Sequence, residues 1–191
     1  LGVNPYQFGF IGSTDSHTAA PDAVSEYQRP YKYGTTATQA LTVAGKPRAV
    51  GFQNPGGLAG VWAEANNRDS IFKALKRRET FATSRPRIAP RFFAGWELSK
   101  TTCNETNLAG PGYRNGVPMG GLLSASPNES AKPRFVVSAN AYAGTSNKPA
   151  HPLQRVQIIK GWVNADGHFE QSVVDVAGDA NNGAGVDTNT C

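Results

Sequence analysis

The feature that most constrains the fold is a strand, a tight turn and a second strand in the C-terminal part of the sequence. Arg155–Val163 alternates between apolar and polar side chains, a period of two that is typical of a strand with one face toward a core. Asn164–Gly167 ends in the Asp-Gly pair that favours a hairpin turn, and Phe169–Val176 predicts the returning strand. The side chains expected to point inward are Val156, Ile158 and Trp162. A long antiparallel hairpin is therefore expected here.

Composition limits the rest of the architecture. With 191 residues, 21 Gly and 13 Pro, the chain suits one large domain or two small ones, rich in loops and poor in long helices. Arg91–Leu98 and Arg134–Ala141 predict two more strands, and Cys103–Gly121 between them predicts a loop. We therefore expect a domain boundary near Ala89, with an α/β part in residues 1–88 and a β-rich, sandwich-like part in residues 89–191.

One helix is predicted in the first part, over about Arg68–Arg78. Asn67 can cap its N-terminus, and basic side chains in the last turn suit the helix dipole. Apolar residues recur at helical spacing and predict a stripe that faces the core. This stripe consists of Ile71, Phe72 and Leu75.

A candidate metal site lies near the N-terminus. Phe8–Gly12 predicts a short buried strand whose two glycines allow another backbone to come close. Asp15 and His17 follow, and side chains two apart on an extended chain point the same way. A carboxylate oxygen and an imidazole nitrogen can together bind Zn, Mn or Fe. The alternative is a turn aspartate beside a hydrogen-bonded histidine.

Two arginines are candidate contacts for an anionic group. Thr80–Ile88 predicts a strand that ends in a Ser-Arg-Pro turn, and Arg85 and Arg87 lie at this turn. A guanidinium can donate two parallel hydrogen bonds to one anion. The alternative is that both side chains are simply solvated.

The net charge of +5 favours small anionic partners over nucleic acid. A nucleic-acid surface is expected to interleave dense Lys/Arg tracts with aromatic residues, and this chain has no such tract. No run approaches the roughly 20 apolar residues of a membrane-spanning helix. We thus expect neither a nucleic-acid partner nor a membrane span.

The cysteines and the first residue suggest a processed or partial chain from an oxidising compartment. Cys103 and Cys191 lie in loop-like surroundings that suit structural disulfides, with partners that can lie outside this sequence. The chain starts at Leu1, so a fragment or processed product is expected. A third idea for the end of the chain is a calcium loop at Asp175–Gly183, whose oxygen ligands suit calcium although their spacing departs from the EF-hand pattern.

Several longer motifs carry a resemblance to a known family. The Gly12–His17 segment is similar to the last metal-binding motif of PHP (polymerase and histidinol phosphatase) domains, with one residue inserted. Together with four later motifs it resembles the C-terminal part of a large bacterial family of secreted, uncharacterised proteins related to PHP hydrolases. The later motifs are Gly57–Glu64, Ala74–Ser84, Gly116–Gly121 and Pro152–Trp162.

This resemblance implies a fold and an activity. It implies that residues 1–88 are the end of a distorted TIM-like barrel, completed by an upstream part of the same protein. It also implies a site of two or three divalent metal ions (Zn, Mn or Fe), with Asp15 and His17 as ligands and the other ligands upstream of Leu1. Arg85 stands where the family usually has glycine, and it would supply an extra anion contact.

The function that follows is that of a fragment of a periplasmic or secreted metal-dependent hydrolase. The expected activity is a phosphoesterase that uses metal-activated water on a small anionic ester. The alternative is a non-catalytic β-rich module with a binding or structural role.

Overall fold

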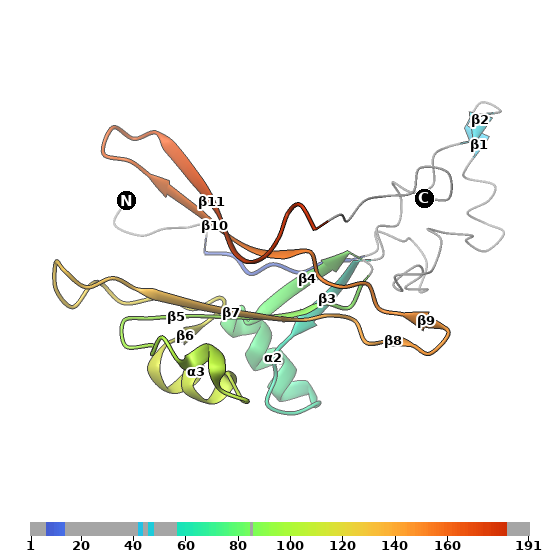
Figure 1. The fold of residues 1–191 in the computed structure, drawn as a ribbon, viewed down its shortest axis with the longest axis horizontal. Coiled ribbons are helices and arrows are strands. Elements are labelled where there is room, and N and C mark those ends of the chain that lie inside the picture. Colours follow the sequence, from blue (N-terminus) through green and yellow to red (C-terminus); the bar gives the residue numbers. More distant parts are fainter. Residues whose placement is uncertain (1–6, 14–41, 44–45, 48–56, 85, 183–191) are drawn as a thin grey trace. The chain divides into compact units, whose positions relative to one another are not determined.

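The computed structural model describes residues 7–13, 42–43, 46–47, 57–84 and 86–182 (Figure 1). The chain divides into two compact units, Leu1–Tyr142 and Ala143–Cys191. The predicted boundary near Ala89 falls inside the first unit. That boundary was predicted from a change in the sequence from an α/β pattern to a β-rich pattern, which the division into compact units does not test, so it stays a prediction.

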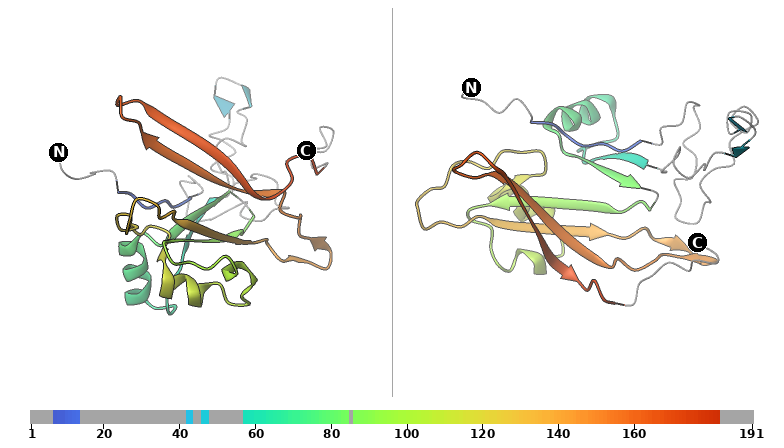
Figure 2. Two further views of the ribbon diagram at one scale, coloured as in Figure 1. Left: turned by 60° about the vertical axis from the view of Figure 1, so that its left-hand side comes forward. Right: turned by 90° about the horizontal axis from the view of Figure 1, so that it is seen from above.

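In the described residues of the first unit, the regular structure is mostly short antiparallel strands. Its strands are β1 (Thr42–Val43), β2 (Lys46–Pro47), β3 (Gly57–Val61), β4 (Thr80–Ser84), β5 (Ala89–Gly95), β6 (Val117–Pro118) and β7 (Arg134–Asn140). Helices α2 (Arg68–Arg77) and α3 (Ala109–Asn115) and a 3-10 turn at Thr102–Asn104 are the helical elements among the described residues of this unit. The described strands pair as β1 with β2, β3 with β4, and β6-β5-β7 in a three-stranded sheet. The strands of this sheet and both α-helices can be followed in Figure 2.

Strands β3 and β4 pair antiparallel although helix α2 lies between them in the sequence. Val61 pairs with Thr80, and Trp62 N–H extends the ladder by donating to Glu79 O at 3.0 Å. Arg78 ends the helix in the left-handed conformation (φ 61°), so the chain turns straight back to the end of β3. The helix is therefore an insertion in a hairpin connection.

Helix α2 confirms the predicted cap but not the predicted buried stripe. The Asn67 side chain accepts a hydrogen bond from Ser70 N–H at 2.9 Å. Ala74 is the buried residue of the helix, whereas Phe72 is 63% exposed and Leu75 is also exposed. The stripe prediction was wrong for Phe72 and Leu75, because the small residue Ala74 lies at the buried face of the helix in their place, whereas Ile71 is half-buried.

The core of the first unit lies on the sheet of β5, β6 and β7. It contains Phe93, Leu98 and Val136, with Leu108 packed against them. Helix α3 packs on β5 and β6 within the segment that was predicted to be a loop. The sequence of this helix, Ala-Gly-Pro-Gly-Tyr-Arg-Asn, conceals it, but Pro111 is acceptable in a first turn and Gly112 lets the helix lie close to the Phe93 ring.

The described residues of the second unit form two hairpins. Short strands β8 (Gly144–Thr145) and β9 (Lys148–Pro149) form one, and β10 (Arg155–Val163) and β11 (Phe169–Gly178) form the other. The latter confirms the predicted strands and turn, since Gly167 N–H donates to Asn164 O at 3.1 Å. Trp162, predicted to point inward, is 39% exposed.

The prediction that residues 1–88 belong to a TIM-like barrel was wrong. Such a barrel needs parallel strands joined by helical crossovers. Every strand pairing among the described residues is antiparallel, and these residues contain two short α-helices. The sandwich-like C-terminal region of the same prediction is replaced by small separate sheets, and the fold is β-rich.

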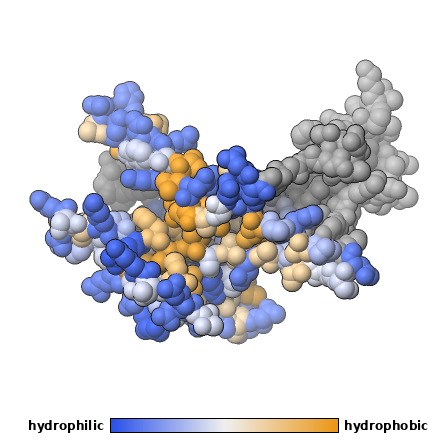
Figure 3. Space-filling view, in the orientation of Figure 1, coloured by the Kyte–Doolittle hydropathy of each residue, from blue (hydrophilic) through white to orange (hydrophobic). Residues whose placement is uncertain are grey.

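The predicted buried strand at Phe8–Gly12 was also wrong. Residues 7–13 form no strand, and Phe8, Phe10 and Ile11 are exposed. The expected close backbone approach is confirmed at Gly12, where a Cβ would lie 2.8 Å from Leu58 O and 3.0 Å from Thr83 O. The segment thus lies against the β3–β4 hairpin. Hydrophobic residues are also visible at the surface in Figure 3.

Candidate functional site

Most of the site residues predicted from the sequence lie outside the described residues. These are Asp15, His17 and Arg85. Arg87 is described and is exposed between β4 and β5. Within the described part of the chain, no three His, Cys, Asp or Glu side chains gather in a way that could hold a metal ion.

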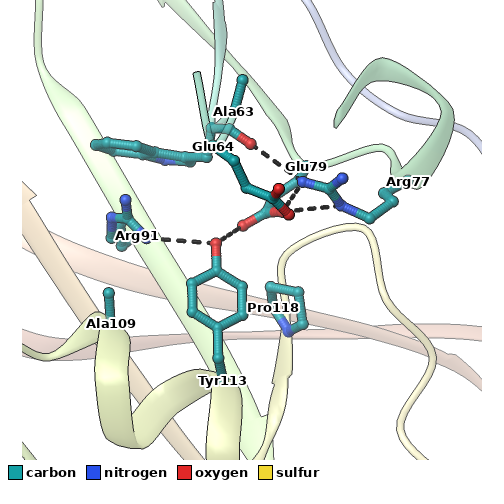
Figure 4. A pocket seen from close by; sticks show the side chains of 9 residues that line it. Ala63, Glu64, Arg77, Glu79, Arg91, Ala109, Tyr113 and Pro118 are labelled. Atoms are coloured by element: carbon teal, nitrogen blue, oxygen red, sulfur yellow. Dashed lines mark hydrogen bonds and ion pairs between the residues drawn. The ribbon is translucent and has the colours of Figure 1, made fainter. Parts of the chain in front are cut away.

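The structure instead brings together a polar cluster that the sequence analysis missed. The cluster lies in a pocket of about 480 Å³ in the first unit, between helix α3 and the ends of β3, α2 and β5 (Figure 4). The pocket is lined by Trp62, Ala63, Glu64, Arg77, Glu79, Arg91, Ala109, Tyr113 and Pro118.

Glu79 is the buried charge of this pocket, with 1% of its surface exposed. Arg77 donates to its Oε2 from Nη2 at 3.0 Å and from Nε at 3.3 Å. The Tyr113 hydroxyl donates to the other oxygen, Oε1. Both carboxylate oxygens are thus occupied, and Arg77 neutralises the charge, as a buried carboxylate requires.

Tyr113 is held in its neutral form. Partial burial and then the hydrogen bond and negative charge of Glu79 raise the pKa of Tyr113 above its ordinary value. The nearby Arg91 acts in the opposite direction without reversing the shift. The hydroxyl therefore stays a donor to Glu79 at neutral pH and can accept a bond from Arg91.

Arg91 is the cation of the pocket without an acidic partner. Its guanidinium carbon lies 3.7 Å from the centre of the Trp62 ring, and Nη1 donates to the Tyr113 hydroxyl at 3.4 Å. Trp62 is itself fixed, because its Nε1–H donates to Pro90 O at 2.9 Å. Among the described residues, Arg91 forms no ion pair. A guanidinium has five N–H donors, so several stay available to a ligand.

The electrostatics of the pocket follow from these two arginines. Arg77 and Glu79 cancel each other, and the exposed Glu64 lies where water screens it. Arg91 is stacked and oriented but not neutralised. An arginine placed in this way suits the planar oxygens of a phosphate or carboxylate.

The fold and pocket define a β-rich protein with a polar pocket centred on Arg91. The chain belongs to a family of proteins of unknown function, DUF3604, which it matches over residues 1–191. No curated protein and no solved structure matches the chain.

Two further predictions concern the surroundings of the protein. In the part of the chain that the structure describes, no helix has the length and apolar character needed to cross a membrane. Cys103 is exposed and free, and Cys191 lies outside the described residues. The predicted location in an oxidising compartment stays a prediction.

Proposed function

We propose that this chain binds a small anionic ester, and that Arg91 contacts its anionic group. The observation that carries the proposal is the state of the Arg91 side chain, which Trp62 and Tyr113 orient and which no described carboxylate neutralises. The surrounding pocket has room for a ligand of several heavy atoms, at about 480 Å³.

The reaction class proposed with this site is metal-dependent hydrolysis, with phosphoester substrates. Its support is the resemblance of Gly12–His17 to a metal-binding motif, in which Asp15 and His17 would be ligands to Zn, Mn or Fe. The described residues by themselves offer no group that fits a metal ion. When bound, such an ion would supply a water activated for attack on the ester. A periplasmic or secreted location and further ligands upstream of Leu1 belong to the same hypothesis.

The second candidate is a non-catalytic binding module. The same Arg91 pocket favours it, because the pocket requires no metal to hold an anion. The two candidates differ only in whether bound ester is hydrolysed.

Binding of phenyl phosphate, measured by titration calorimetry, tests the pocket. Arg91→Gln should weaken binding at least tenfold, because a hydrogen-bonded charge contact is worth about 1.5–3 kcal/mol. Arg87→Gln is the matched control: it removes the same charge from an exposed position that does not line the pocket, and should change binding less than twofold. Loss of binding in Arg87→Gln but not in Arg91→Gln would refute the pocket and favour the turn arginines.

Elemental analysis tests the metal hypothesis separately. A protein that extends upstream of Leu1 should contain stoichiometric divalent metal, and Asp15→Ala and His17→Ala should each reduce that content and the phosphoesterase rate. Full metal content and unchanged turnover in both variants would contradict it, whatever the result for Arg91.

A further inference from the structure

Arg91 lines a second pocket as well as the first. The second pocket, of about 340 Å³, also lies within the first unit and is lined by Arg91, Cys103, Glu105, Thr106, Asn107, Leu108, Ala109, Val137, Ser138 and Asn140. Arg91 and Ala109 are the residues common to both. The guanidinium is therefore the charged group at the junction of two spaces.

The register of the sheet explains this position. Arg91 on β5 pairs with Ser138 on β7, and Phe93 pairs with Val136. Side chains two apart on a strand lie on one face, so the same face changes from the buried core at Phe93 and Val136 to polar groups at Arg91 and Ser138. Asn140 continues the polar end of that face.

The two pockets differ in chemistry. The first offers the Trp62 and Tyr113 rings and the side chains of Ala63 and Pro118, so beyond its charged groups it presents apolar walls. The second offers hydroxyl, amide and carboxylate groups from Thr106, Ser138, Asn107, Asn140 and Glu105. Groups of this second kind bind hydroxyls, whereas the first suits a compact apolar substituent.

Charge limits the ligand further. Arg91 is one uncompensated cation, and the Glu79 carboxylate is linked to it through the Tyr113 hydroxyl. A single negative charge at Arg91 would be balanced, whereas a second would meet no further free cation in the first pocket, because Arg77 is already paired with Glu79.

We infer that the ligand is a phosphodiester, with its single charge on Arg91, a compact apolar substituent in the first pocket and a hydroxyl-bearing substituent in the second. A phosphomonoester has one substituent and a charge of about −1.5 to −2, so it fills one pocket and carries excess charge. This inference rests on the proposed anion site at Arg91 and specifies its substrate class.

Titration calorimetry of the full chain with four probes tests the inference. The probes are inorganic phosphate, phenyl phosphate, glycerol phosphate and the diester glyceryl phenyl phosphate. We expect the diester to bind at least tenfold more tightly than either monoester. A diester that binds no more tightly than phenyl phosphate would overturn the inference, and if Arg91→Gln still abolished phenyl phosphate binding, the simpler anion site would stand.

Two filling variants assign the substituents to their pockets. Ala63→Leu fills only the first pocket and should remove the gain in affinity that the phenyl group gives to a phosphate ligand. Ser138→Leu fills only the second pocket and should remove the gain in affinity that the glyceryl group gives. Far-UV circular dichroism and thermal unfolding, compared with the unmodified chain, check that both variants fold. Equal loss of both gains in each variant would contradict two separate pockets. Stronger binding to phosphatidylglycerol vesicles than to the soluble diester would overturn the assignment to a small soluble ligand.

Discussion

The Arg91 pocket and the β10–β11 hairpin are built in opposite ways. In the pocket, the local ion pair of Arg77 with Glu79 is combined with contacts between residues far apart in the sequence, as in the bond between Tyr113 and Glu79, 34 positions apart. The hairpin consists of local pairs across one turn, and its large side chains are exposed, up to 90% for Phe169. A two-stranded hairpin of this kind is marginally stable by itself. Long-range contacts thus build the site, while local pattern builds the hairpin.

Truncating a phenylalanine in each region should give the largest contrast. Phe93 is 1% exposed and belongs to the core beneath α3, so Phe93→Ala should lower the free energy of unfolding by about 4 kcal/mol. Phe169→Ala should cost less than about 0.5 kcal/mol, because the side chain is already in water. Urea unfolding followed by circular dichroism measures both. Similar losses in the two variants would mean that the hairpin face is covered in solution.

Removing the buried carboxylate should have the next largest effect. Glu79→Ala leaves Arg77 and the Tyr113 hydroxyl without their acceptor, and we expect a loss of about 3 kcal/mol, near the low end for a buried pair because Arg77 reaches water. Glu64→Ala, an exposed carboxylate of the same pocket, should change unfolding by less than about 0.5 kcal/mol. Equal urea midpoints for Glu79→Ala and the unmodified chain would contradict the assigned role of Glu79.

Two glycines have nearly the same positive φ angle, but one is closely packed and the other lies in an open turn. Gly120 (φ 79°) has Arg78 O only 2.2 Å from where a Cβ would lie, and Gly167 (φ 81°) in the hairpin turn has nothing within 4 Å. Gly120→Ala should therefore cost about 2 kcal/mol or more, and Gly167→Ala about 1 kcal/mol from backbone strain alone. Thermal unfolding of the two variants measures the difference. The reverse order would contradict the packing of Gly120 against the end of α2.

The smallest expected effect is a dependence of stability on alkaline pH. Because the folded state raises the pKa of Tyr113, the unfolded chain loses this proton first as the pH rises. The contribution is therefore complete below the ordinary tyrosine pKa of about 10 and is lost as the pH rises through the higher folded value. Tyr113→Phe should show a shallower loss of stability above about pH 9 in urea unfolding. Parallel curves for the two proteins would contradict the shift.

The sequence predicted the elements whose cause is local. The Asn67 cap and the Asn164–Gly167 turn depend on residues within four positions, and both are confirmed. Strands β7 and β10 were also predicted from alternation or apolar content. The partner of β10 was predicted with it, but the partner of β7 was not, since the pairing of β5 with β7 joins segments separated by a long connection.

The pocket could not be predicted for the same reason. Glu79 follows a helix and Arg91 lies in a strand, and neither position differs in sequence from an ordinary solvated charge. Their roles arise from the left-handed turn at Arg78 and from the β5–β7 register. One signal was present in the sequence. Arg91 and Phe93 are two positions apart on a predicted strand, so the charge of Arg91 lies on the same face as the core residue Phe93.

A crystal structure of the full chain with bound glyceryl phenyl phosphate tests the central claim most directly. The account predicts that the phosphate lies within hydrogen-bonding distance of the Arg91 guanidinium, with the phenyl group beside Ala63 and Pro118 and the glyceryl group beside Ser138. A phosphate bound at Arg87, or anywhere else with the Arg91 guanidinium left in water, would contradict it.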